Sequence, residues 1–195
     1  MLLIKTGNLE ETIHKHANEL LNSNCIHTQV LRQHHEINKI NPFCVNTIRF
    51  DTFIDKSGKT HIFSALMRFW VNGSNVDNAN SGGFCVGIDL EEGRLKRSGR
   101  QMMRYGGLEF EKHPDSDFIF KDFLIPFFSE AYELVLNAVE CIPDRLIGWD
   151  VAITESGPVI IEGNITPGMF LSDIAYGGYL KNPLFKEIME ELKYV

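Results

Sequence analysis

Apolar residues recur every three or four positions in three stretches of the chain, and this spacing predicts three helices. The predicted helices cover residues 9–21, 123–139 and 183–192. The second stretch is strongly apolar, so we expect a buried helix that begins around Pro126 and ends before Pro143. The third opens on Asn182 and Pro183, a pair typical of a helix start.

Runs rich in β-branched and aromatic residues, separated by turn residues, predict strands. These strands cover residues 25–32, 45–54, 61–71, 84–90, 151–154 and 159–161. Residues 55–59 are expected to join two strands as a hairpin, and the polar residues 72–83 to join the next two as a loop. A helix, a group of antiparallel strands, a buried helix, a hairpin and a closing helix together predict the α+β class.

The last two predicted strands flank a turn of Glu-Ser-Gly-Pro at residues 155–158, and acids occupy facing positions on them. If the hairpin is centred near Ser156, Asp150 lies opposite Glu162. Asn164 then shares the face of Glu162, because side chains alternate along a strand.

Opposed carboxylates with Cβ atoms about 4.5–5.5 Å apart repel each other unless one is protonated or a cation lies between them. The pattern favours a divalent cation. Mg²⁺ takes one or two carboxylates together with substrate phosphates, so it implies a nucleotide partner. The alternative is a surface hairpin that carries two unrelated acids.

Two arginines lie on predicted strands ahead of this hairpin. Arg49 is expected to point away from the apolar face, together with Asp51. Arg68 is expected to share a face with Ile62 and Leu66, an unusual place for a guanidinium unless an anion lies there. Because a guanidinium can bind two phosphate oxygens at once, one interpretation is phosphate binding. The other pairs Arg49 with Asp51 or another acid of the sheet.

The segment 76–83 is a second candidate for phosphate binding, because small residues and paired glycines let backbone amides approach a phosphate. A plain surface turn explains it equally well. The segment has neither the lysine of a Walker motif nor a Gly-x-Gly-x-x-Gly pattern. The seven histidines show no metal-ligand spacing, and the pair His34 and His35 is expected to be solvated at the surface.

The bulk properties narrow the class of partner. With 195 residues and 44% hydrophobic content, the chain is expected to be an ordinary globular protein. A net charge of -7 argues against nucleic acid as the main partner. The sequence has no long apolar run and no signal-peptide core, so we expect a cytoplasmic protein without a membrane partner. The four scattered cysteines favour reduced, buried thiols over a zinc site or a disulfide framework.

The residues of the acidic hairpin resemble a known motif, the C-terminal catalytic hairpin of the ATP-grasp superfamily. The matching residues are Gly148-Trp149-Asp150, Gly157-Pro158, Glu162-Gly163-Asn164 and Pro167-Gly168. Upstream segments are similar to the sugar-transfer-associated branch of that superfamily. These segments are Gln33-His34, Asn41-Pro42, residues 45–49, Arg68, Asp77-Asn78 and Gly82-Gly83. The resemblance covers residues 25–168.

The resemblance implies an ATP-grasp-like antiparallel sheet with flanking helices, and a role for each matched residue. It implies that the metal, Mg²⁺ or alternatively Mn²⁺, is held by Asp150, Glu162 and Asn164. It implies that phosphate or an acyl-phosphate is contacted by Arg49 and Arg68, with the assistance of Asn78. It implies that the adenine of ATP is contacted by Gln29, Val30 and Leu31.

In this family ATP phosphorylates a carboxylate, and an amine or another nucleophile attacks the acyl-phosphate. Such catalysis rests on alignment and charge neutralisation, which arginines and magnesium supply. The resemblance therefore implies an ATP- and Mg-dependent carboxylate ligase-like protein linked to cell-surface sugar or polysaccharide biosynthesis. Its partners would be a nucleotide and a carboxylate-bearing small molecule or sugar.

In one respect the chain departs from the family pattern. The lobe that carries lysines and a flexible glycine-rich loop precedes the adenine segment in the family, and few residues precede Gln29 here. We therefore expect a single ATP-grasp-like C-terminal domain over residues 1–195, truncated at its N-terminal side. Residues 1–24 would form a residual N-terminal helix and residues 25–195 the matched region, and a separate N-terminal lobe would complement it.

Two further functions stay open beside the ligase. The chain is alternatively a non-catalytic nucleotide- or metal-binding module, or a fragment of a split enzyme. A metal-dependent phosphohydrolase ranks last, because it would need a general base near the site and the sequence places no histidine next to the hairpin.

Overall fold

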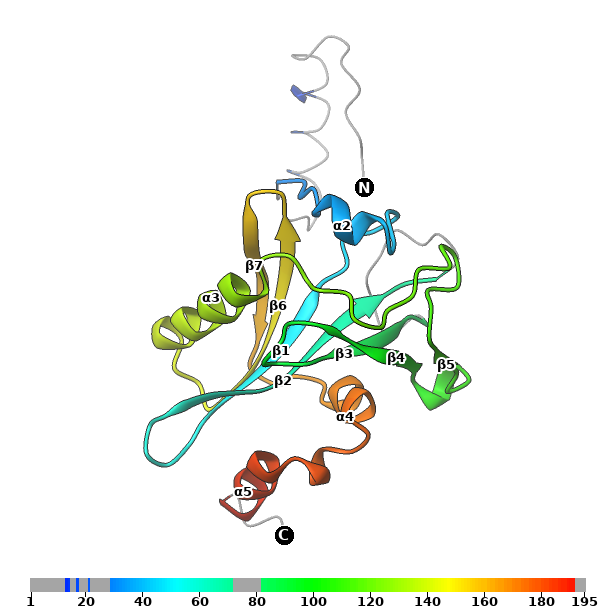
Figure 1. The fold of residues 1–195 in the computed structure, drawn as a ribbon. Coiled ribbons are helices and arrows are strands. Elements are labelled where there is room, and N and C mark those ends of the chain that lie inside the picture. Colours follow the sequence, from blue (N-terminus) through cyan, green and yellow to red (C-terminus); the bar gives the residue numbers. More distant parts are fainter. Residues whose placement is uncertain (1–12, 15–16, 18–20, 22–28, 72–81, 192–195) are drawn as a thin grey trace. The chain divides into compact units, whose positions relative to one another are not determined.

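The computed structural model describes residues 13–14, 17, 21, 29–71 and 82–191 (Figure 1). The chain divides into two compact units, Met1–Val30 and Leu31–Val195. In the first unit, the described residues 13, 14, 17 and 21 are helical, within the stretch where apolar spacing predicts the first helix. No helix in the described ranges is long and apolar enough to cross a membrane. The architecture below is that of the second unit.

Seven strands form one antiparallel sheet in the order β5-β4-β3-β2-β1-β6-β7. The strands are β1 (Ile48–Ile54), β2 (Thr60–Phe69), β3 (Phe84–Ile88), β4 (Leu95–Gln101), β5 (Glu109–Phe110), β6 (Leu146–Thr154) and β7 (Gly157–Asn164). The helical elements are α2 (His35–Asn38), η2 (Met103–Tyr105), α3 (Phe128–Cys141), α4 (Phe170–Tyr176), η3 (Tyr179–Lys181) and α5 (Pro183–Glu191). The predicted α+β class, an antiparallel sheet with flanking helices, is confirmed.

The main core lies between α3 and one face of the sheet (Figure 1). α3 buries one stripe because its apolar residues Phe128, Ala131, Val135 and Val139 recur every three or four positions. Phe50 on β1 meets Phe128 with ring centroids 5.7 Å apart. The rest of the core is filled by side chains that point to this face from β1, β2, β3, β4 and β6, and these are fully or almost fully buried.

A smaller core lies on the opposite face, where η3 and α5 pack. Phe53 follows the main-core residue Phe50 by three positions on β1, so it points to the other side of the sheet. It is buried there with Phe63, Tyr179 and Ile188. The segment that follows β7 therefore packs on this second face of the sheet. Arg49 and Asp51 alternate with Phe50 on β1, so their side chains also point to this face.

A bulge in β2 corrects one expectation. Asp51 pairs with Ser64 while the next residue, Thr52, pairs with Ile62, so Phe63 is an extra residue in the ladder. Ile62 consequently lies in the main core, whereas Arg68 and Leu66 lie on the opposite face. The prediction that Ile62 shares a face with Arg68 is wrong, because strict alternation was assumed through the bulge.

Two predicted elements have other boundaries in the structure. α3 begins at Phe128, because residues 123–125 pair with the start of β4: the amide of Leu95 donates to Phe123 and that of Ile125 to Gly93, both at 3.0 Å. Residues 29–32, the described end of the strand predicted for 25–32, are irregular, and sheet-like pairing starts only at an isolated bridge from Gln33 to Thr154.

Three of the four cysteines lie in the described residues: Cys44, Cys85 and Cys141. Cys85 on β3 is buried, and burial raises its pKa to about 12 against the opposing charge of Arg68, so it is an unreactive thiol. Cys141, the last residue of α3, is exposed, so the prediction of burial is wrong for that residue.

His113 is fully buried and gives a pH-dependent prediction. Its Nε2–H donates to the carbonyl of Trp70 at 2.9 Å, and its Nδ1 accepts the amide of Asp115 at 3.2 Å, so both nitrogens are satisfied by a neutral ring. Burial lowers its pKa, against the opposing effects of the Trp70 carbonyl and Asp115.

The folded protein therefore binds fewer protons at this ring than the unfolded chain does, and unfolding is favoured as the pH falls below about 6.5. We expect His113→Gln to lose less stability than the wild type between pH 7.5 and pH 5.5, measured by urea unfolding at both values. Equal losses in the two proteins would show that His113 is not the group responsible.

Candidate functional site

The hairpin of β6 and β7 places Asp150 opposite Glu162 and Gly148 opposite Asn164, as predicted. The register closer to the turn differs from the expectation, because Thr154 pairs with Gly157 around a two-residue turn. Asp150 pairs with Glu162 while the next residue, Val151, pairs with Ile160, so Ile161 is an extra residue in β7 that shifts the register by one. Without this bulge, Asp150 would face Ile161 and Glu162 would point to the other side of the sheet.

β1 lies beside β6, and Arg49 is the residue directly opposite Asp150. The Arg49 Nε donates to Asp150 Oδ1 at 2.5 Å and Nη2 donates to Oδ2 at 3.0 Å. This is the parallel two-point contact that fixes a guanidinium and a carboxylate in one plane.

Arg68 on β2 reaches the same carboxylate, with Nη2 3.0 Å from Asp150 Oδ2. Its Nε also donates to Thr47 Oγ1 at 3.0 Å, which holds the side chain along the end of β1. Three neighbouring strands thus direct Arg49, Arg68 and Asp150 to one point.

These three side chains are largely shielded from water, with exposed fractions of 12% for Arg49, 14% for Arg68 and 2% for Asp150. Burial by itself would raise the pKa of Asp150, but the hydrogen bonds and charges of the two arginines outweigh it and hold the pKa below its usual value. Burial likewise would lower the pKa of Arg49, yet Asp150 raises it, with smaller contributions from Asp51 and Glu162. Asp150 and Arg49 are therefore both ionised at neutral pH.

Glu162 and Asn164 lie at the accessible edge of this cluster. Glu162 is exposed, and Asn164 Nδ2 donates to Glu162 Oε1 at 3.1 Å, so the amide oxygen of Asn164 is directed away from that bond. Arg49, Arg68, Asp150 and Glu162 carry two positive and two negative charges, which cancel. Guanidinium groups supply the positive charge that the facing carboxylates require. Of the two interpretations of Arg49, the structure contains the pairing with an acid of the sheet, Asp150.

Gly148 leaves the space that this cluster needs. A Cβ atom at that position would lie 2.7 Å from the Cβ of Pro167 and 3.0 Å from Arg49 Nη1. The loop after β7 and the Arg49 side chain therefore both pack against the bare backbone of β6.

The remaining predicted site residues are Gln29, Val30, Leu31 and Asn78. Asn78 lies outside the described residues. Gln29, Val30 and Leu31 are irregular, with Gln29 and Val30 in the first unit and Leu31 in the second.

The structure adds a buried carboxylate, Asp51, which the sequence pattern indicated only as a partner for Arg49. Three hydroxyl groups converge on its Oδ2: those of Ser64 at 2.6 Å, Ser172 at 2.5 Å and Tyr179 at 2.9 Å. Oδ1 has no hydrogen-bond partner among the described residues. Asp51 lies two residues from Arg49 on the same face, and its bonds anchor α4 and η3 to the sheet.

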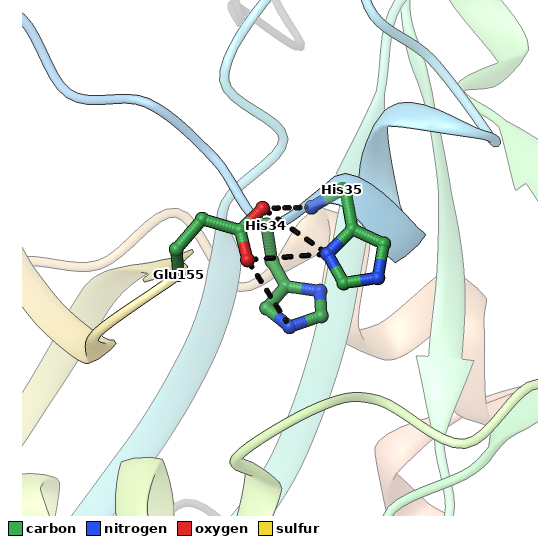
Figure 2. Close-up of side chains that lie close together, drawn as sticks. All are labelled: His34, His35 and Glu155. Carbon is green, nitrogen blue, oxygen red and sulfur yellow. Dashed lines mark hydrogen bonds and ion pairs between the residues drawn. The ribbon is translucent and has the colours of Figure 1, made fainter.

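A second group of side chains gathers at the hairpin turn, where sequence analysis expected solvated histidines. Figure 2 shows His34 and His35 facing Glu155, the first residue of the turn between β6 and β7. One ligand atom from each of the three lies within 4.8 Å of the others. The prediction that no histidine lies next to the hairpin is thus wrong. Glu155 follows Asp150 by five residues, roughly 16 Å along a strand, so neither histidine is placed to act on the Asp150 cluster.

Comparisons with known proteins show to which family the chain belongs. No curated protein and no solved structure gives a significant match. The family model described as sugar-transfer associated ATP-grasp matches residues 8–188, which is most of the chain. This range includes β1, β2, the hairpin of β6 and β7, the helices α3 and α4, and the first part of α5. The chain therefore belongs to the sugar-transfer associated ATP-grasp family.

Proposed function

We propose that this protein is an ATP- and Mg²⁺-dependent, carboxylate ligase-like member of its family that serves cell-surface sugar or polysaccharide biosynthesis. The observation that carries the proposal is the meeting of Asp150, Glu162, Arg49 and Arg68 across four neighbouring strands of the sheet. Proteins of this family generally bind ATP together with a divalent metal. The cluster supplies oxygen donors and phosphate-binding cations side by side.

The donor set fits a hard cation such as Mg²⁺, with Mn²⁺ as an alternative, because all the donors are oxygen atoms. Glu162 is exposed, and the amide oxygen of Asn164 lies beside it. Asp150 has two oxygens with about four acceptor positions, and three of them receive arginine N–H groups, which leaves one. These three residues would hold the ion, which supplies neutralisation of phosphate charge when bound.

Arg49 and Arg68 would bind the transferred phosphoryl group. The Asp150 carboxylate contacts both guanidinium groups, and it binds Arg49 in the two-point geometry that a phosphate also takes. Phosphate oxygens would exchange with that carboxylate on the guanidinium groups. Transfer of the phosphoryl group to a substrate carboxylate then releases ADP, and attack of a nucleophile on the acyl carbon releases phosphate.

The test is calorimetric titration of MgATP into the wild type and into Glu162→Ala. We expect the affinity to fall at least about tenfold, a loss of about 1.4 kcal/mol, because one of the two carboxylates of the site is removed. Glu111→Ala is a matched control, since Glu111 is an exposed glutamate that forms an ion pair with Arg97 at the far side of the sheet. An unchanged isotherm for Glu162→Ala would refute the site.

A second candidate is a non-catalytic module that binds nucleotide or metal, or one part of a split enzyme. It is favoured by the three arginine contacts of Asp150, because a purely structural ion pair would show the same contacts. ADP formation by the isolated chain in the presence of carboxylate acceptors would contradict this candidate, whereas MgATP binding without turnover would support it.

A further inference from the structure

The cluster of His34, His35 and Glu155 lies apart from the proposed nucleotide site and is built by the backbone around it. The amide of His34 donates to the carbonyl of Ile153 at 2.8 Å, and Gln33 forms a bridge to Thr154. These contacts bind the start of α2 to the last residues of β6. The two histidines are thereby held next to the turn that carries Glu155 (Figure 2).

Glu155 already joins both histidines. Its Oε1 accepts the backbone amide of His35 at 2.8 Å, and both of its oxygens lie 3.1 Å from His35 Nδ1. His34 Nε2 lies 3.8 Å from Glu155 Oε2. Two imidazole nitrogens and a carboxylate oxygen therefore face one small volume at the surface.

The chemistry of this donor set differs from that of the Asp150 cluster. Mg²⁺ prefers oxygen ligands, whereas imidazole nitrogen combined with a carboxylate suits Zn²⁺ and neighbouring transition metals. Two histidines and one acidic residue are a ligand set that leaves one position of a tetrahedral zinc for water. We propose that His34, His35 and Glu155 form a transition-metal site, separate from the magnesium site, that fastens the start of α2 to the hairpin turn.

Two local changes accompany metal binding. His34 Nδ1 accepts the amide of Glu36 at 3.2 Å, so in the metal-free protein the proton of a neutral His34 ring is on Nε2. Ligation through Nε2 moves that proton to Nδ1 and ends the hydrogen bond from Glu36. His35 Nδ1 faces both carboxylate oxygens of Glu155, so it carries a proton there, and ligation through Nδ1 moves that proton to Nε2, which lies 3.3 Å from Glu36 Oε1. The His35 ring also turns out of its stack on His34, at 4.3 Å, to aim the lone pair at the metal, which its exposed position permits.

The experiment is a titration of tag-free full-length protein with Zn²⁺ by calorimetry and with Co²⁺ by visible absorption, in excess MgCl₂. We expect one Zn²⁺ per chain at this site and a tetrahedral Co²⁺ spectrum. The variants Glu155→Gln and His35→Gln should each lower the affinity at least tenfold. Both side chains are exposed, and unchanged circular dichroism will show that the variants fold.

The matched control is His61→Gln, because His61 also pairs with a carboxylate, Asp55 at 2.8 Å, but belongs to no group of three metal-ligating side chains among the described residues. It should bind Zn²⁺ like the wild type, and so should Glu162→Ala, which separates this site from the proposed nucleotide site. Nitrogen chemical shifts of His34 should change from the Nε2–H to the Nδ1–H form when Zn²⁺ is added. Equal Zn²⁺ affinity in the wild type and Glu155→Gln, or an unchanged His34 tautomer, would overturn the proposal and leave an ion-pair cluster.

Discussion

Replacing Asp150 by alanine should lower the free energy of unfolding by about 3–5 kcal/mol, because the change leaves two nearly buried guanidinium groups without their shared anion. Arg49 would lose both of its bonds to the carboxylate, and Arg68 would lose its contact with Asp150 Oδ2. The loss is measured by urea unfolding at pH 7, where the pair is ionised.

A surface ion pair of the same sheet provides the comparison. Glu109 and Arg100 face each other on β5 and β4 with about half of each side chain exposed, so Glu109→Ala should cost no more than about 1 kcal/mol. If Asp150→Ala lowered the free energy of unfolding no more than Glu109→Ala does, Arg49 and Arg68 would not depend on Asp150 as a buried counter-ion.

Replacing Asp51 by alanine should be the second large effect, with a loss of about 3 kcal/mol in the free energy of unfolding. The hydroxyl groups of Ser64, Ser172 and Tyr179 would all lose their acceptor in a buried place. Ser172→Ala and Tyr179→Phe each remove one donor and should cost about 1 kcal/mol each, measured in the same urea experiment.

The contrast with Asp55 tests whether burial is the reason. Asp55 also accepts several hydrogen bonds, from Ser57, Lys59 and His61, but it lies in an exposed hairpin turn where water can replace them. Asp55→Ala should therefore be clearly milder than Asp51→Ala. Equal losses would mean that the Asp51 network does not anchor α4 and η3.

Local patterns predicted the parts of the fold that are decided locally. The hairpin of β6 and β7 and the turn between β1 and β2 were predicted because turn residues separate apolar runs. The strand β4 was missed because its sequence, Leu-Lys-Arg-Ser-Gly-Arg-Gln, is mostly polar, and only pairing with β3 on one side and β5 on the other makes it a strand. The bulges at Phe63 and Ile161 have no local signal, since they belong to the pairing of two strands.

The candidate site shows the same limit. The facing of Asp150 and Glu162 follows from one short hairpin, and so it was predictable. The contact of Arg49 with Asp150 joins residues 101 positions apart, and that of His35 with Glu155 joins residues 120 positions apart. Both depend on which strands become neighbours in the sheet. The spacing of histidines along the chain therefore could not reveal a group completed by Glu155.

The cancellation of charge at Arg49, Arg68, Asp150 and Glu162 has a kinetic consequence. A neutral cluster exerts little field beyond the Debye length of about 8 Å in physiological salt, so it does not attract a triphosphate from a distance. The net charge of -7 on the whole chain opposes the approach of such an anion. Added salt should therefore leave the association rate of MgATP unchanged or raise it slightly, and discrimination among anions would take place after contact, when the guanidinium groups exchange one oxyanion for another.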